Sequence, residues 1–313
     1  MRSSTKQRSS LAGKLDQSPL KLARDGRAVV LVGQGNLWPG AGADMFRLAE
    51  RAQSAGTAPL VTACFLNHRR PTIAEALARC AGRGASELVL QPYFLDVGRF
   101  VRQDLERALE QLRAAHPGVG MLVARPFGDH PALARLALKR ALEADYLAAH
   151  PQIASWAGPR PLDEGASWQP LHTRHRAGML LIAHGAPGTS AHATLQSIAR
   201  QVLASGRYAS VEVACLDPGQ PSVADALLAL ARRGIAHMIA VPAMLHLGGP
   251  ARVQLPRLLA LARQRLPHST IILAEHLGYD RLLVSAIGDR VAEALRGSAA
   301  AHATQHPALG WEG

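Results

Sequence analysis

The sequence predicts an α/β fold built from two tandem copies of one unit, each a mostly parallel four-stranded sheet flanked by helices, with a cleft between the copies. Short apolar runs alternate with amphipathic stretches of helical period, which is typical of parallel sheets. Residues also recur at a constant distance of 150 positions, as in the pairs Gly35 and Gly185, Pro71 and Pro221, Pro92 and Pro242, Gly98 and Gly248, and Gly128 and Gly278. We infer an internal duplication.

Four strands are expected in each copy. Those of the first copy are Ala28–Val32, Leu60–Leu66, Glu87–Leu95 and Gly120–Ala124, with helical patterns between them such as Asp44–Ala55 and Thr72–Ala81. Those of the second copy are Met179–Ala183, Val211–Leu216, His237–Leu245 and Thr270–Ala274. Because the apolar spacing is the same in both copies, the two domains should share one topology.

The segments outside these patterns divide the chain. Residues 1–27 form a basic stretch without periodicity, and residues 150–176 are rich in proline, so we expect a disordered tail and a linker. The predicted organisation is a first domain at 28–149, a second domain at 177–296 and a small, polar, disordered tail at 297–313.

Composition bounds the class of protein. The 313 residues are 48% hydrophobic, which is sufficient for packed cores, and the net charge of +12 suits a polyanionic ligand. Aromatic residues make up 4% and are not interleaved with Arg and Lys, so nucleic acid is the less favoured ligand. The three cysteines show no CxxC spacing, and neither a signal-peptide pattern nor a membrane-spanning apolar run occurs, so we expect a cytoplasmic protein.

Metal-binding residue types follow the predicted strands of the second copy. Ligands of open α/β sheets gather where the strands end at their carboxyl side. The residues expected there are His184, Asp217, His246 and Glu275 followed by His276. Imidazole and carboxylate groups suit a divalent first-row metal, so their convergence predicts a metal site. The glycines beside His184 would let a flat ligand approach the backbone.

The first copy differs at the equivalent positions. Its residues there are Gln34, Asn67, Asp96 and Pro126. Gln and Asn keep roughly the shape and polarity of His and Asp but lose their basicity and charge. The first copy is therefore expected to form a pocket wall that has lost its chemistry.

Four motifs in this order resemble the sirohydrochlorin chelatase family of class II chelatases. They are Ile182-Ala183-His184-Gly185, Leu216-Asp217 leading to Pro221-Ser222, Val241-Pro242 leading to Gly248, and Leu277-Gly278. The resemblance implies a bilobal protein of cobalamin or siroheme biosynthesis, which inserts Co²⁺ or Fe²⁺ into sirohydrochlorin or a related tetrapyrrole. It implies no organic cofactor, and we expect a monomer whose lobes are related by a pseudo-two-fold axis.

The resemblance also implies roles for individual residues. His184 and Asp217 match the family's first histidine and its acid, whereas the second histidine would fall at Pro250, so His246 would supply the imidazole from four residues earlier. The expected catalytic residues are His184, Asp217 and His246. The expected metal ligands are His184, His246 and Glu275. The tetrapyrrole would contact Gly185, Gly248 and Arg252, and further candidates for its carboxylates are Arg69, Arg70, Arg99 and Arg102.

Two alternatives remain open at this point. The first is a non-catalytic carrier of a tetrapyrrole or metal, which the altered first copy and Pro250 would suit. The second is a nucleic-acid-associated protein that uses the basic residues before Arg27. A dinucleotide-binding enzyme is disfavoured, because Trp38 replaces the third glycine of the pattern that Gly33 and Gly35 begin.

Overall fold

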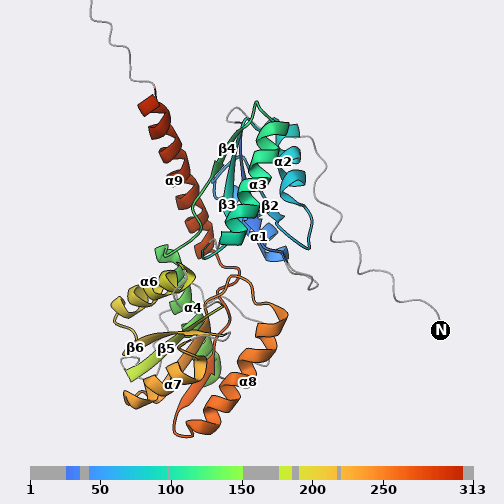
Figure 1. Ribbon diagram of the computed structural model, residues 1–313. Helices are drawn as coiled ribbons and strands as arrows, with labels where there is room; N and C mark the ends of the chain where they lie inside the picture. The colour runs from blue at the N-terminus through green and yellow to red at the C-terminus, as the bar shows by residue number, and fades with distance from the viewer. Residues whose placement is uncertain are drawn as a thin grey trace, which may run out of the picture.

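The chain forms two lobes, each built on a four-stranded parallel sheet (Figure 1). This computed structural model describes residues 26–35, 42–96, 99–150, 176–184, 190–216 and 220–305. The predicted tail before Arg27 and the predicted linker lie almost entirely outside the described residues. The strand orders are β2-β1-β3-β4 and β6-β5-β7-β8, which confirms two α/β units of one topology.

The element bounds repeat as the sequence does. In the first lobe the strands are β1 Arg27–Gly33, β2 Leu60–Phe65, β3 Glu87–Pro92 and β4 Gly120–Val123, and the helices are α1 Ala43–Ser54, α2 Ile73–Gly82, α3 Arg99–Ala115 and α4 Pro131–Ala149. In the second the strands are β5 Ala177–Ala183, β6 Ser210–Cys215, β7 His237–Pro242 and β8 Thr270–Leu273, and the helices are α6 Ser190–Ala204, α7 Val223–Arg232, α8 Gly249–Arg265 and α9 Leu282–Gln305. All four strand pairs are displaced by 150 residues.

The last helix of each copy packs on the other copy. Helix α4 contacts α6, β7 and β8 of the second lobe, and α9 contacts α1, β3 and β4 of the first. Figure 1 shows α4 beside the lower sheet and α9 running along the upper lobe. Each sheet is therefore covered on one face by helices of its own copy and on the other partly by a helix from the other copy.

One hydrophobic cluster is shared between the lobes. It joins alternate strand residues such as Leu31 and Leu181 to the crossing helices, through Leu133 of α4 and Leu283 of α9. The opposite strand faces pack into separate clusters, one with α2 and α3 and one with α7 and α8. Because successive side chains of a strand point to opposite faces, each inner strand contributes residues both to the cluster of its own lobe and to the shared cluster.

The largest difference from the predicted strand boundaries falls on the third strand of each copy. These strands end at Pro92 and Pro242, three residues earlier than expected, and the apolar residues that follow are buried in a loop in the second copy and buried or half-buried in the first. Ala243 and Leu245 pack in the shared cluster while Met244 packs in the second lobe's own cluster, so burial and not strand pairing explains this apolar run.

The predicted disordered tail from residue 297 is wrong in its first part. Helix α9 continues through Gln305. The segment after Gly297 is rich in alanine, which has the highest helix propensity, and no proline interrupts it before Pro307.

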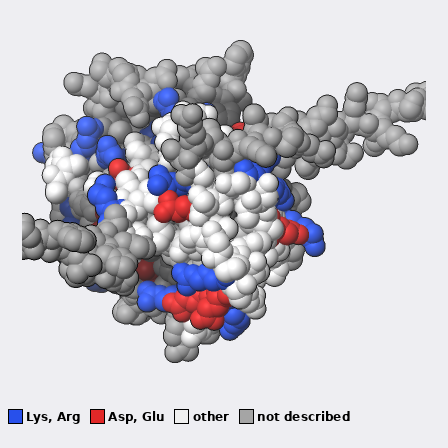
Figure 2. All heavy atoms as spheres, turned by 90° about the horizontal axis from the view of Figure 1, so that it is seen from above, with Lys and Arg blue, Asp and Glu red and all other residues white. Residues whose placement is uncertain are grey.

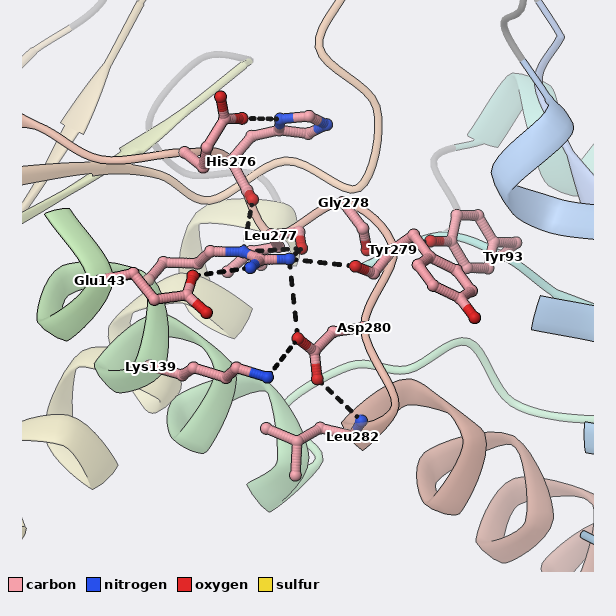
Figure 3. A network of polar contacts seen from close by, with 11 residues as sticks. Tyr93, Lys139, Glu143, His276, Leu277, Gly278, Tyr279, Asp280 and Leu282 are labelled. Carbon is pink, nitrogen blue, oxygen red and sulfur yellow. Dashed lines mark hydrogen bonds and ion pairs between the residues drawn. The ribbon is translucent and has the colours of Figure 1, made fainter. Parts of the chain in front are cut away.

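Buried arginines at equivalent positions of the two crossing helices form hydrogen bonds to backbone carbonyls between the copies. Arg140 of α4 donates hydrogen bonds at 3.0 to 3.3 Å to the backbone carbonyls of His276, Leu277 and Tyr279 in the second lobe. Glu143 accepts from the same guanidinium at 2.8 Å (Figure 3). In the reciprocal contact, Arg290 of α9 donates to the carbonyl of Phe127.

A second pair of contacts joins each crossing helix to the cap of the other. Asp280 accepts from the amide of Leu282 at the start of α9 and forms a 2.8 Å ion pair with Lys139 of α4 (Figure 3). At the equivalent place, His130 accepts from the amide of Ala132 at the start of α4 and contacts Asp289 of α9 at 3.1 Å. At this interlobe position the acidic residue therefore lies on the cap in one copy and on the crossing helix in the other.

We expect Arg140→Ala to lower the free energy of unfolding by about 3 kcal/mol, because it leaves buried carbonyls and Glu143 without their charged donor. Urea unfolding of the whole chain measures this value. The matched control is Arg135→Ala, an exposed position on the same helix, where the loss should stay below about 0.5 kcal/mol. Equal losses in both variants would show that the carbonyl contacts contribute nothing.

Candidate functional site

A pocket of about 280 Å³ lies between the lobes at the carboxyl ends of the strands. Its lining comes from both copies and consists of Gln34, Gly35, Gly42, Phe65, His184, His246 and Gly248. Gln34 and His184 are equivalent residues that directly follow β1 and β5, so the pocket is centred between the ends of the two inner strands. The structure thus brings together the two predicted histidines.

The first-lobe wall is backbone packed against an aromatic ring. Gly35 has a φ of +77°, and a Cβ there would lie 1.9 Å from the carbonyl oxygen of Asn67. Gly42 has a φ of +90°, and its Cβ would lie 2.5 Å from the ring of Phe65. Both conditions require glycine, because the left-handed conformation and the close approach each exclude a side chain. This wall is smooth and uncharged.

The second-lobe wall carries imidazole groups. His184 follows the fully buried strand β5 and is exposed at its end, where it lines the pocket. His246 lies four residues beyond the end of β7 and not at the strand end, because β7 stops at Pro242. The loop between β7 and α8 places His246 half-buried at the pocket, beside Gly248, the N-cap of α8.

Burial, and to a smaller extent the neighbouring His276, lower the pKa of His246 to about 4, whereas Asp44 of the first lobe acts in the opposite direction. Removal from water disfavours the charged imidazolium. His246 is consequently neutral near pH 7, which leaves a ring nitrogen with a lone pair available to bind a metal or accept a proton.

Glu275 and His276 lie beside this site rather than in the pocket lining. Nδ1 of His276 contacts a carboxylate oxygen of Glu275 at 3.2 Å, and this hydrogen bond holds the pKa of Glu275 below its usual range. Figure 3 shows the His276 carbonyl directed toward the Arg140 network and its ring on the other side. The structure does not bring Glu275 into the pocket lining beside His184 and His246, as a shared metal site would require.

The remaining predicted residues have less definite places. Asp217 and Gly185 lie outside the described residues. Arg252 on α8 is exposed and donates to the carbonyl of Leu247 at 3.2 Å. Arg70 forms a 2.6 Å ion pair with Glu75, and both Arg70 and Arg102 are exposed.

Within the described part of the chain, no group of three or more His, Cys, Asp or Glu side chains is arranged to hold a metal ion. A metal ion bound by the two pocket histidines would therefore need a further ligand, either from outside these residues or from a bound substrate. Leu216, the residue before Asp217 in the sequence, donates its backbone amide to the carbonyl of Ala183 at the end of β5 at 2.8 Å.

Sequence reasoning missed the first-lobe aromatic residues of the site. Tyr93 is fully buried and its ring centroid lies 5.0 Å from that of His246, and Phe65 lines the pocket. The only available signal was a difference between the copies, since Ala243 and Cys215 occupy the equivalent positions. That signal is weak, because it does not tell which lobe an aromatic ring faces.

Charge on the surface is divided into small groups. On the face seen in Figure 2, the described Lys and Arg side chains form separate groups, some of which adjoin Asp and Glu. No helix in the described ranges is both long and apolar enough to span a membrane.

The fold defines a bilobal α/β protein with a pocket between two like lobes. Comparison with known proteins identifies the family. The family model described as CbiX matches residues 28–144 and again residues 178–294. The chain therefore belongs to the CbiX family, in a form with two repeats. This confirms the resemblance to class II chelatases that the strand-end motifs predicted.

Individual relatives agree with this family. Sirohydrochlorin cobaltochelatase of Priestia megaterium is 29% identical over 124 residues, which are 40% of this chain and 40% of that protein. Sirohydrochlorin ferrochelatase of the same organism is 21% identical over 234 residues, 74% of this chain and 76% of that protein. The match to the first of these relatives thus spans less than half of its length.

Solved structures support the same fold. The structure described as SirB from Bacillus subtilis with Fe³⁺ has a TM-score of 0.69 to this chain at 18% identity, covering 88% of this chain and 97% of that one. At this identity the likeness shows a shared bilobal architecture.

The low pKa of His246 predicts an acid-sensitive contribution to stability. Between about pH 6.5 and pH 4 the unfolded chain binds a proton at this residue that the folded chain does not, so the free energy of unfolding falls as the pH falls through this window. Urea unfolding at several pH values measures this effect. Between about pH 6.5 and pH 4 the free energy of unfolding of His246→Gln should fall by about 1 to 3 kcal/mol less than that of the wild type. Parallel pH profiles would contradict the low pKa.

Proposed function

We propose that this protein inserts a divalent metal, Co²⁺ or Fe²⁺, into sirohydrochlorin or a related tetrapyrrole of cobalamin or siroheme biosynthesis. The observation that carries the proposal is the interlobe pocket, which has imidazoles on one wall and an uncharged glycine and aromatic surface on the other. Membership of the CbiX family and the names of the chelatase relatives support the same activity. The metal is a substrate, and the reaction needs no organic cofactor.

The two walls suit a flat macrocycle bound between them. The first-lobe wall, with Gly35 and Phe65, would contact one face of the ring by van der Waals packing. His184 and His246 would face the other side and hold the metal, as neutral imidazoles bind Co²⁺ and Fe²⁺. Exposed arginines such as Arg252 would bind the carboxylates at the rim of the macrocycle.

The chemistry is an exchange of one metal ion for two protons. When M²⁺ passes to the pyrrole nitrogens, the macrocycle loses two N–H protons and the overall charge is unchanged. The ring nitrogens that release the metal can accept these protons, because a neutral imidazole is both a metal ligand and a base. In this proposal Asp217 orients a histidine or passes protons to solvent. Cytoplasmic location and a monomeric state remain predictions.

His184→Ala should lower kcat/KM for metal insertion by at least about 100-fold, because it removes a metal ligand and proton acceptor at once. The rate is followed by the change in absorbance of sirohydrochlorin when Co²⁺ is added. His268→Ala is the matched control, since His268 is exposed in the same lobe in the turn before β8, and it should retain the wild-type rate. A wild-type protein that binds sirohydrochlorin tightly but does not accelerate insertion would instead be a carrier.

Asp217→Asn should lower kcat/KM by about 10- to 100-fold, the usual effect of removing a group that orients a ligating histidine. Asp225→Asn is the control in the same lobe, because that exposed carboxylate accepts a 2.6 Å hydrogen bond from Ser222 at the start of α7 and does not line the pocket. If both variants keep the wild-type rate, Asp217 has no role in the reaction.

A further inference from the structure

The geometry assigns to Tyr93 of the first lobe a positioning role for His246 of the second, so that the lobe without ligands holds one of the metal-binding imidazoles in place. This inference rests on the proposed function for its consequence. It concerns a contact between lobes that neither the family motifs nor the resemblance to chelatases identifies.

Tyr93 is held on several sides. It follows β3, and its amide bonds to the carbonyl of Val32 at 2.8 Å, which continues the sheet by one residue. Its ring is buried and meets Phe127 edge to face at 5.5 Å. Its hydroxyl donates to the carbonyl of Gly278 in the second lobe at 3.3 Å. Figure 3 shows Tyr93 reaching the loop that contains Gly278 and Tyr279.

His246 rests against this fixed ring. The ring centroids of Tyr93 and His246 lie 5.0 Å apart with an interplanar angle of 51°. His246 also lines the pocket, so the imidazole lies between a buried aromatic surface behind it and the pocket in front. An imidazole in a loop has few local restraints, and contact with a ring that itself cannot move limits its rotamers.

The contact exists on one side of the pseudo-two-fold axis only. The residue equivalent to Tyr93 in the second copy is Ala243, and the residue equivalent to His246 in the first copy is Asp96. Alanine has no ring to support a side chain across the interface. Tyrosine is therefore present where the opposite lobe carries the imidazole, and is missing where the opposite lobe carries Asp96.

The contact also accounts for an imidazole at this position. The resemblance places the family's second histidine at Pro250, in the first turn of α8, and proline has no metal-binding side-chain group. His246 approaches from the preceding loop, and Tyr93 provides the support there that a helix would otherwise provide. Without the Tyr93 ring we expect the His246 side chain to adopt several rotamers. Metal binding is then weaker, because fixing the imidazole in the single binding rotamer costs free energy.

The test uses Co²⁺ alone as the probe, with the whole chain. Tyr93→Met keeps an apolar side chain of similar reach but no ring, and should weaken Co²⁺ binding by about 10-fold, measured from the visible absorption of the bound ion. Tyr93→Phe keeps the ring and should stay within about 3-fold of the wild type. A loss that Tyr93→Phe shares in full would overturn the role of the ring.

A double-mutant cycle separates positioning from general stability. In a His246→Ala background, Tyr93→Met should have no further effect on Co²⁺ affinity, because the residue it positions is gone. An equal loss in both backgrounds would make Tyr93 a structural residue only and contradict the inference. If Tyr93→Met does not fold, Phe127→Leu loosens the same ring from its buried side, and its effect on Co²⁺ affinity must likewise vanish in the His246→Ala background.

Insertion activity distinguishes this inference from the proposed function. If the wild type inserts metal into sirohydrochlorin but Tyr93→Met does not change Co²⁺ affinity, only the positioning role is refuted. If the wild type does not insert metal but Co²⁺ affinity depends on Tyr93 through His246, only the proposed activity is refuted.

Discussion

Each repeat places its last helix against the sheet of the other repeat, and the position of the site depends on this exchange. Because α4 and α9 cross between lobes, the largest hydrophobic cluster belongs to both copies and the pocket lies between parts that share a core. Arg140 and Arg290 then fix the loops after β8 and β4 by bonding to their carbonyls. Packing and buried hydrogen bonds between the copies thus set the spacing of the pocket walls.

Within this frame the two pocket histidines have different surroundings. Burial keeps His246 uncharged near neutral pH, while His184 stands exposed at the end of β5. The two imidazoles thus reach the pocket from different surroundings, one half-buried beside Tyr93 and the other exposed to solvent.

Much of this arrangement could be predicted from the sequence, because its signals are local or repeated. Apolar periodicity predicted the eight strands that the structure describes. The constant offset revealed the duplication and showed that Gln34 and His184 are equivalent residues, and both line the pocket between the lobes. What could not be predicted depends on contacts between distant residues. Nothing near α4 in the sequence indicates that it packs on β7, and the apolar run through Leu245 resembles a strand although it is a buried loop. Tyr93 was missed for the same reason.

The exchanged helices also bear on how the two copies can diverge. A duplicated domain that loses its ligands would ordinarily be free to drift or to be deleted. Here the first copy supplies α4, which forms part of the core around β7 and β8, so a change that unfolds α4 would also remove part of the second copy's core. The second repeat therefore depends on the fold of the first, whereas the exposed Gln34, which stands where the second repeat has His184, lies outside that shared core.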